Sequence, residues 1–224
     1  MTLDSAIATR TRIPLLFLST FDCPSDNKQA QFYARKLPSD IGRWSSTLPF
    51  HVTQGALSAN TLTNREIGEQ FQADYILTGD LQLLDEGIRA SVVISQARGG
   101  RQLWARTYQL DGADTSMLID KLAGNIAIAV ALSFDQFERE RLKDVPEDQL
   151  DAWGLTARSM GLSVRTNQEA REWLRISRLA VQRDGDCAEA HANLANGILA
   201  ILLASFDCDI SEEDLKREAL HHCD

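Results

Sequence analysis

The segment from Tyr75 to Tyr108 holds three strand-like runs joined by two tight-turn signals, and it constrains the fold more than any other part of the chain. The turn signals are Asp85-Glu86-Gly87 and Arg98-Gly99-Gly100, in which glycine tolerates the positive φ that tight hairpin turns need. Between them, apolar residues alternate with polar ones from Ile88 to Ile94, which is the period of a half-buried strand. The segment therefore predicts an antiparallel meander.

Two shorter strand candidates precede the meander. Ile13 to Phe21 is an apolar run that ends at the turn formers Asp22 to Asn27, and Phe50 to Thr53 is the second candidate. Helical patterns separate these strands from each other and from Tyr75. The order strand, helix, strand, helix, strand demands crossover connections and a parallel core, so the sequence predicts an α/β fold with a mixed sheet.

The two intervening helices carry different signals. In the first, four large side chains recur at helical spacing: Tyr33, Leu37, Ile41 and Trp44. Pro38 predicts a break there, with a second helical segment restarting at the proline. In the second helix, Thr63-Asn-Arg-Glu66 has the spacing of a capping box, and the helix should end near Gln72 or Ala73.

After the meander the chain becomes entirely helical. Asp114 is placed as the N-cap of a helix whose apolar stripe consists of Leu118, Leu122, Ile126 and Val130. We expect an α/β domain over residues 12–142, a linker over 143–149 and a helical repeat region over 150–224. Four helices are predicted in that last region: Asp151–Leu162, Asn167–Arg183, Asp186–Ala204 and Ser211 to the end.

Charge and cysteine usage exclude several classes of function. The formal net charge of -9, with no block of basic residues, argues against direct binding to nucleic acid. The four cysteines lack the short paired spacings of a zinc module or a disulfide framework, so we expect free thiols. The apolar run Ile13 to Leu18 is too short to span a membrane and lacks a cleavage site. We therefore expect no membrane contact and a cytoplasmic location.

Three pieces of the meander carry a family resemblance: Ala73 to Leu81, Arg89 to Ile94, and the Leu-Trp-Ala-x-x-Tyr element within Gln102 to Tyr108. Together they resemble the TolB-like amino-terminal domain that accompanies tetratricopeptide repeats in bacterial regulators. The stretch Ala180 to Ala195 is similar to the end of one tetratricopeptide repeat and the start of the next, with Gly185 where the repeats usually have proline. The repeat region looks truncated within its second repeat.

The resemblance implies a role by position. Such modules lie carboxy-terminal to an effector, either a class III adenylate cyclase or a winged-helix DNA-binding domain of the CadC type. They are taken to regulate the effector or to recruit partners. Neither effector is present in these residues, so any cyclase activity would belong to an attached domain.

Candidate sites for chemistry are weak in this sequence. Cys187 and His191 are four residues apart, and His221-His222-Cys223 adds further soft ligands, but no ligand set has a diagnostic spacing. Gly79-Asp80 and Gly99-Gly100 open no phosphate-binding helix, and the chain contains no Gly-x-Ser-x-Gly elbow. We nominate no catalytic, cofactor-binding or metal-binding residue and expect no cofactor.

Aromatic side chains are the candidates for partner binding. Trp104 and Tyr108 share one face of the last strand, which is either covered by the Leu118–Val130 helix or exposed to a partner. Trp153 and Trp173 either seal helix packing or line a partner groove. His191 completes this set of candidates.

Two classes of function follow from these observations. The first is a non-catalytic regulatory and protein-interaction module, because stacked helix pairs present extended surfaces for recognition. It would bind a protein partner or an attached effector, and an incomplete array would favour self-association through the terminal helices. The alternative is an α/β domain that binds a nucleotide or another small molecule, with enzymatic activity, through the loops after Phe21 and Thr53.

Overall fold

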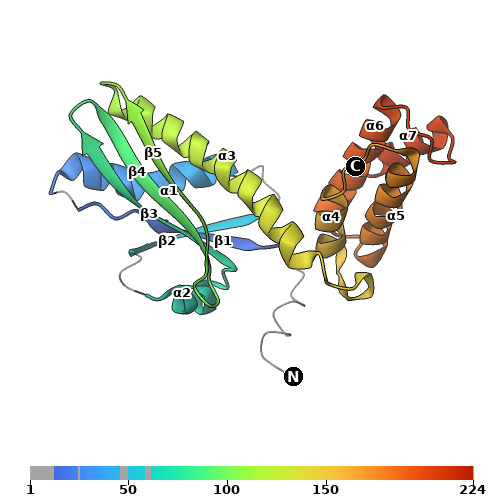
Figure 1. Cartoon of the computed structure of the whole chain (residues 1–224), viewed down its shortest axis with the longest axis horizontal. Coiled ribbons are helices and arrows are strands. Elements are labelled where there is room, and N and C mark those ends of the chain that lie inside the picture. The colour runs from blue at the N-terminus through green and yellow to red at the C-terminus, as the bar shows by residue number, and fades with distance from the viewer. Residues whose placement is uncertain (1–12, 25, 46–49, 59–61, 224) are drawn as a thin grey trace. The chain divides into compact units, whose positions relative to one another are not determined.

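The computed structural model describes residues 13–24, 26–45, 50–58 and 62–223. It divides into a unit formed by Ile13–Phe134 and a second unit that begins at Asp135. This division falls inside a long helix, whereas the sequence analysis places a linker at 143–149. The linker at 143–149 stays a prediction. Each unit is described by itself below (Figure 1).

The first unit is built on a five-stranded mixed sheet in the order β2-β1-β3-β4-β5. The strands are β1 (Leu15–Thr20), β2 (His51–Ser58), β3 (Tyr75–Leu84), β4 (Gly87–Gln96) and β5 (Gln102–Asp111). β1 pairs in parallel with β2 and β3, whereas β4 is antiparallel to both β3 and β5. The predicted α/β class, with its parallel core and its meander, is confirmed.

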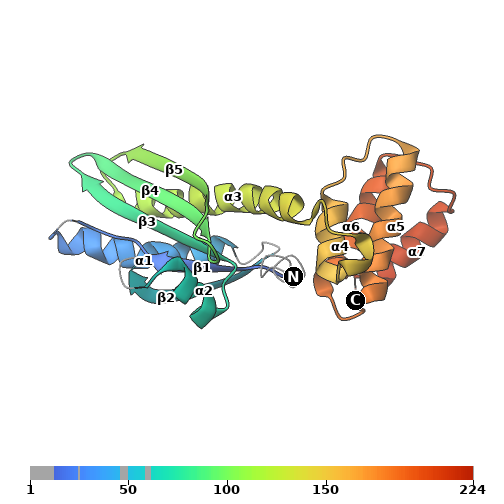
Figure 2. The ribbon, with the colours of Figure 1, turned by 60° about the horizontal axis from the view of Figure 1, so that its bottom comes forward.

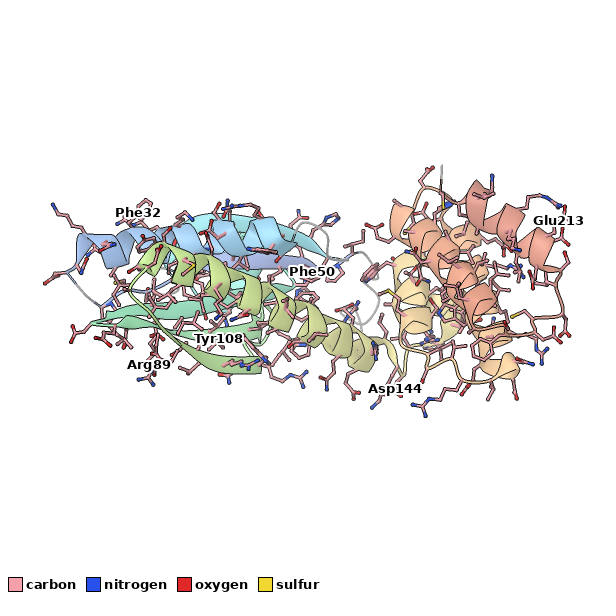
Figure 3. All side chains as sticks on the ribbon, turned by 90° about the horizontal axis from the view of Figure 1, so that it is seen from above. Phe32, Phe50, Arg89, Tyr108, Asp144 and Glu213 are labelled. Carbon is pink, nitrogen blue, oxygen red and sulfur yellow. The ribbon has the colours of Figure 1, made fainter. Side chains whose placement is uncertain are left out.

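Helices cover the two faces of this sheet unequally. α1 (Lys28–Trp44) and α3 (Thr115–Leu142) lie side by side on one face, and α2 (Asn64–Phe71) lies on the other (Figures 1 and 3). Under α1 and α3 the pleat presents Leu16, Leu18 and Leu77, all fully buried. Under α2 it presents Phe17 and Ile76, which pack with Ile67, Ala73 and Ala97.

Pro38 lies inside α1 instead of breaking it, so the predicted restart of the helix at this residue is wrong. A proline at this position cannot donate to the carbonyl of Ala34, four residues earlier. That carbonyl accepts the Phe21 N–H instead, at 3.3 Å. A donor from the segment that follows β1 thus supplies the bond that the helix lacks. Pro38 is also buried, so its ring adds packing that a rule based on local sequence does not consider.

The buried stripe of α1 is offset from the predicted one. Ala30, Ala34, Leu37 and Ile41 are buried, whereas the side chain of Trp44 is 59% exposed. Trp44 lies over Gly124 of α3, where a Cβ would be 3.7 Å from the indole ring. Trp44 therefore keeps the helical spacing of the predicted residues but covers the neighbouring helix from outside.

Local helix-start signals are confirmed at both predicted positions. Thr63 and Glu66 form a reciprocal capping box at the start of α2, which ends at Gln72 in the left-handed conformation. Asp114 Oδ1 accepts the Met117 N–H at 3.1 Å at the start of α3. Such caps satisfy amide groups that lack partners in the first helical turn.

α3 is long and apolar enough to cross a membrane by length and composition alone, and among the described helices it alone meets that test. In this structure its predicted stripe is buried, with Leu118, Leu122, Ile126 and Val130 each at most 6% exposed. Core helices share this composition, because one face must be apolar to pack on a sheet.

The second unit is helical. After the end of α3 come the 3-10 turn η2 (Glu147–Gln149) and four helices, α4 (Ala152–Met160), α5 (Asn167–Arg183), α6 (Ala188–Leu203) and α7 (Glu212–His221). All four predicted helices are present (Figure 2). α4 packs on α5, and α6 packs on α4, α5 and α7, a stacking in which each helix pair rests on the next.

Candidate functional site

The candidate partner-binding aromatics contribute mainly to packing in this structure. Tyr108, Trp153 and Trp173 are buried, and Trp104 is half-buried. Trp104 and Tyr108 stand opposite Ile94 and Ala90 in the ladder, so they belong to the face that α1 and α3 cover. On this strand face Tyr108 is buried and Trp104 is half-buried, while Arg106 is exposed, and partner binding through these side chains stays a prediction.

Tyr108 is buried at the edge of this layer without a polar partner of its own. Its hydroxyl has no hydrogen-bond partner among the described residues. Burial raises the pKa of Tyr108, and the cation of Arg106 opposes that effect. The Arg106 guanidinium lies over the ring, 5.1 Å from its centroid, a geometry in which the cation is attracted to the ring face.

Trp173 joins α5 to α6 by occupying the space beside a glycine. A Cβ built at Gly197 of α6 would lie 1.7 Å from Cη2 of Trp173. The indole therefore rests directly on the backbone of α6. With Ala170, Leu174, Leu194 and Ile198 it forms the core of the helical unit.

A small polar cluster also links α4, α5 and α6. The Asn193 side-chain amide of α6 donates to Ser159 Oγ of α4 at 2.9 Å and to Ser177 Oγ of α5 at 3.3 Å. Both serines are fully buried. Because buried polar groups are costly without partners, these bonds favour one arrangement of the three helices.

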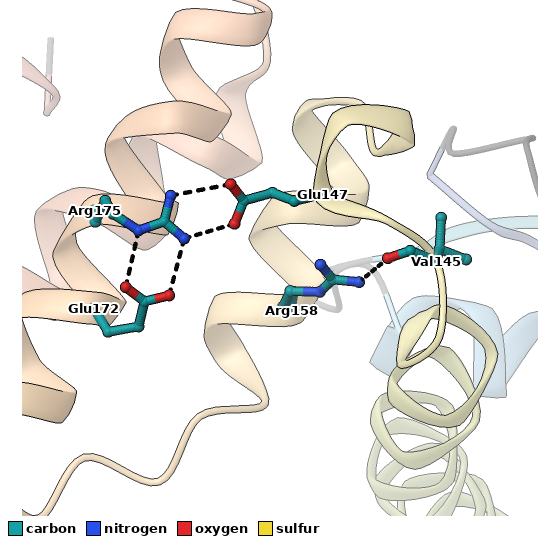
Figure 4. A network of polar contacts seen from close by, with 5 residues as sticks. All are labelled: Val145, Glu147, Arg158, Glu172 and Arg175. Carbon is teal, nitrogen blue, oxygen red and sulfur yellow. Dashed lines mark hydrogen bonds and ion pairs between the residues drawn. The ribbon is translucent and has the colours of Figure 1, made fainter.

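Arginines of α4 and α5 bind the predicted linker 143–149. Arg158 of α4 donates to the carbonyls of Leu142, at 2.8 Å, and Val145. Arg175 of α5 binds both carboxylate oxygens of Glu147, at 3.0 and 2.6 Å (Figure 4). The segment is therefore held to the helical unit at several points.

The same network changes the ionisation of its carboxylates. Arg175 also contacts Glu172, at 2.8 and 2.9 Å. The hydrogen bonds from Arg175 lower the pKa values of Glu147 and Glu172, so both carboxylates stay ionised near neutral pH. All three side chains are substantially exposed to solvent, so the network fixes geometry more than it adds stability.

α7 is attached to α5 and α6 by both apolar and polar contacts. Leu215 enters the core of the helical unit. Arg178 of α5 binds Glu218 of α7 through two bonds, at 2.7 and 2.6 Å. His191 of α6 and His222, directly after α7, face each other with 2.8 Å between their Nδ1 atoms.

The contact between His191 and His222 depends on which ring nitrogens carry hydrogen. His191 Nε2 also lies 2.9 Å from the Gly185 carbonyl. Because only a protonated nitrogen can donate to a carbonyl, Nε2 of His191 carries the hydrogen. In the neutral pair, His191 Nδ1 is then the acceptor and His222 Nδ1 the donor. His191 thus links α6 to the end of α7.

Burial lowers the pKa of His222, and the neighbouring imidazoles of His191 and His221 lower it further, while Glu218 opposes them. The folded unit therefore binds fewer protons here than the unfolded chain, whose histidines titrate near pH 6.5. We expect the stabilisation from neutral His222 to be complete above about pH 6.5 and to be lost as pH falls through the lowered pKa. In urea unfolding across this pH range, the free energy of unfolding should depend less on pH for His222→Gln than for the wild-type chain. The same pH dependence of the free energy of unfolding in both proteins would contradict this.

The exposed side of α6 is the feature that sequence reasoning missed. From Ala190 to Leu203 this helix contains no Asp, Glu, Lys or Arg. Its exposed residues form one stripe at helical spacing: Ala192, Asn196, Leu199, Ala200 and Leu203. Leu199 is 53% and Leu203 79% exposed. The sequence signal was the absence of charged residues along this run. A helix that buries only one face normally carries charged or polar residues on its other face.

The structure describes only part of the two loops that were predicted to bind a small ligand. Thr53 lies inside β2, so no loop follows it, and the end of that strand leads to residues outside the described part of the chain. Asp22, directly after Phe21, pairs with β3 through its backbone. Its N–H donates to the Gly79 carbonyl and its carbonyl accepts the Leu81 N–H, each at 2.8 Å. Gly79 is a strand glycine packed on Phe21. Gly99 and Gly100 have positive φ, as turn glycines do.

Metal-ligating groups are sparse in the described ranges. Within residues 13–24, 26–45, 50–58 and 62–223, no three or more His, Cys, Asp or Glu side chains form a group that could hold a metal ion. Cys187 Sγ lies 3.7 Å from a carboxylate oxygen of Glu189. Burial raises the pKa of the Cys187 thiol, and the nearby Glu189 and Asp184 raise it further, so it remains protonated near neutral pH.

Neither a family model nor a curated protein sequence matches the chain. Among solved structures, it is similar to a PelC dodecamer from Paraburkholderia phytofirmans (13% identity, 56% of this chain and 90% of that chain, TM-score 0.42). It is also similar to TolB from Acinetobacter baumannii (13%, 54% and 28%, 0.38) and to a protein from Xanthomonas campestris (10%, 58% and 90%, 0.42). Similarities this distant say nothing about function.

Proposed function

We propose that this chain is a non-catalytic regulatory and protein-interaction module of a larger bacterial signalling protein. In this proposal a TolB-like α/β domain precedes a tetratricopeptide-like helical region, as in regulators that carry a cyclase or a winged-helix effector. The module acts in the cytoplasm by holding a protein partner or its attached effector.

The exposed face of α6 is the observation that carries the proposal. A helix that is apolar on all sides is normally buried on all sides. Here one side packs in the core through Leu194 and Ile198, while Leu199 and Leu203 remain in solvent. An exposed, uncharged stripe on a well-packed unit is typical of a surface that another protein covers.

The rigidity of the supporting unit favours recognition as well. Trp173 against Gly197, the polar cluster at Asn193, and the arginine contacts of residues 142–150 hold the helices in one arrangement. A preformed surface loses little conformational entropy when it binds. Asn193 and Arg178 use their polar groups to tie helices together, which suits a preformed recognition surface.

Charge placed on the stripe tests the proposal. We expect the tagged chain, in extracts of the cell that produces it, to migrate as an assembly larger than a monomer. Leu199→Lys with Leu203→Lys should reduce the assembly to the monomer, because a buried unpaired lysine is strongly disfavoured at an interface. Both leucines are exposed, so folding is preserved. Gln182→Lys, at an exposed position of α5, is the control and should change nothing.

A wild-type chain that migrates as a monomer, or variants that all migrate alike, would contradict the proposal. The alternative function has its own readout. Metal-free thermal unfolding with a panel of nucleotides should give a flat response. Saturable stabilisation by one of them would instead favour a small-molecule-binding α/β domain.

A further inference from the structure

β5 is a free edge of the sheet in the part of the chain that the structure describes. It pairs with β4 on one side, and no described strand pairs with its other side (Figures 1 and 2). An edge strand presents a row of backbone N–H and C=O groups that another strand can bind. β5 is therefore a candidate surface for strand pairing.

The usual protections of a sheet edge are few along β5. Natural edge strands are kept short, bent by bulges, or interrupted by proline and lysine. β5 has ten residues and contains neither proline nor lysine. Its register shift lies at its beginning, and from Trp104 to Asp111 its ladder with β4 is regular. β2, at the other edge, shifts register within its pairing with β1, so β5 is the edge better suited to regular pairing.

The register of β4 and β5 shows which backbone groups of β5 point outward. Directly beyond the ladder, the Gly112 N–H donates to the Glu86 carbonyl at 3.1 Å, so these two residues form a hydrogen-bonded pair. Hydrogen-bonded and non-hydrogen-bonded pairs alternate along an antiparallel ladder. Counted along the regular register, Ala105, Thr107 and Gln109 fall at non-hydrogen-bonded positions. Their N–H and C=O groups therefore point away from β4, toward the free edge.

The side chains of β5 are complementary to those of a second copy of β5 in one antiparallel register. With Thr107 at the two-fold axis, Trp104 stands opposite Leu110 of the second copy, and Arg106 stands opposite its Tyr108. Trp104 and Leu110 are both half-buried, so pairing them removes further apolar surface from water. Arg106 already lies over the ring of its own Tyr108. Both pairs occupy non-hydrogen-bonded positions of the new ladder, where side chains lie closest.

The neighbouring registers are less favourable. An axis at Arg106 sets the two Arg106 side chains directly opposite each other, and like charges in that position are destabilising. An axis at Tyr108 leaves Trp104 outside the regular ladder and sets Arg106 opposite Leu110. A pairing of Thr107 with Arg106 moves the helix-covered faces of the two sheets to opposite sides. The charge of Arg106 thus selects the register centred on Thr107.

We propose that β5 binds β5 of a second copy, antiparallel and with Thr107 at the axis, which joins the two five-stranded sheets into one. The contact is two-fold symmetric, so it closes after two copies. One pair of strands is a small interface, and small interfaces are typical of weak complexes. We therefore expect a dimer in concentrated solutions of the purified chain, whereas in dilute extracts the stripe on α6 determines migration.

Sedimentation over a concentration series tests the pairing. The full chain carries Leu199→Lys and Leu203→Lys, so that the stripe on α6 does not contribute. We expect a dimer whose dissociation constant rises about tenfold or more with Thr107→Pro, because both hydrogen bonds at the axis are lost. An edge strand tolerates proline where the N–H points outward. Thr107→Val keeps the backbone donor, and this matched control should leave the dissociation constant unchanged.

A disulfide tests the register. Under mild oxidation, Thr107→Cys should give a covalent dimer, because residues paired at this position have Cα atoms about 5.5 Å apart, which is within disulfide range. Ala105→Cys should give none, because its two copies lie about 14 Å apart along the strands. Both substitutions are made together with Cys223→Ser, which removes the exposed native thiol.

Three outcomes would overturn the proposal. They are a chain that stays monomeric at every concentration, a dimer that Thr107→Pro does not weaken, and equal crosslinking through Thr107→Cys and Ala105→Cys. If Thr107→Pro fails to fold, the comparison of the two cysteine variants decides. Each of these outcomes concerns β5 alone and leaves the proposed role of α6 to its own test.

Discussion

Gly197→Ala is expected to destabilise the helical unit by about 3 kcal/mol, although alanine favours helices by about 1 kcal/mol over glycine. The new Cβ would lie 1.7 Å from Cη2 and 2.2 Å from Cζ2 of Trp173. The indole must then leave the core, and the loss approaches that of truncating a buried tryptophan. Denaturant unfolding monitored by circular dichroism, together with tryptophan fluorescence, measures the change.

Gly185→Ala is the matched control for this substitution. A Cβ at Gly185 would meet nothing within 4 Å, so we expect a neutral result or a small gain. Combining Gly197→Ala with Trp173→Leu should cost less than the sum of the two single changes, because the smaller side chain frees the space that the methyl group needs. Additive losses, or an unchanged stability for Gly197→Ala, would show that α5 and α6 do not meet in this way.

Gly79→Ala is expected to destabilise the α/β unit by about 2–3 kcal/mol. A Cβ at this position of β3 would lie 2.5 Å from Cε1 of Phe21 and 2.5 Å from the carbonyl oxygen of Ser91. The phenyl ring can rotate away, but the carbonyl belongs to the ladder between β3 and β4. Relief of the clash therefore requires local separation of the two strands, which thermal or urea unfolding detects.

Gly124→Ala, in the same unit, should behave in the opposite way. Its Cβ would make an ordinary contact with the Trp44 indole at 3.7 Å, and alanine favours the interior of α3 by about 1 kcal/mol over glycine. We expect a gain of that order. A destabilised Gly124→Ala, or a Gly79→Ala as stable as the wild type, would contradict the packing of this unit.

The sequence predicted those elements whose signals are local. The capping box at Thr63 and Glu66 and the N-cap at Asp114 each lie within one helical turn, so no tertiary information was needed. The meander followed from its glycine turns and its alternation. The parallel pairing followed from chain order. Antiparallel neighbours can be joined by a short hairpin, whereas parallel neighbours need a longer crossover connection, usually a helix, and a helix lies between these strands.

Predictions that depended on tertiary partners failed. Pro38 continues α1 because a donor at Phe21 reaches the carbonyl of Ala34, and no local rule contains that bond. Trp44 fits the helical period but covers α3 from outside. β2 continues to Ser58, past the predicted end at Thr53, since pairing with β1 extends the strand.

The candidate site was only partly readable from the sequence. The charge-free run of α6 was visible, but which of its residues are exposed depends on how α4, α5 and α7 pack against it. The contact between His191 and His222 joins residues far apart in sequence, and only the return of α7 to α6 brings them together. The bulky Trp173 likewise became interpretable only once Gly197 was found beside it.

Site-specific photo-crosslinking on α6 tests most directly whether another protein covers this helix. With a photo-reactive residue at Ala200, between Leu199 and Leu203, illumination of the producing cell should give one defined adduct with a partner or a second copy. The adduct should disappear when Leu203→Lys is added, and the same probe at Gln182 of α5 should give none. A probe at Ala200 that crosslinks to nothing, or to the same proteins as the probe at Gln182, would contradict a protein-binding role for this face.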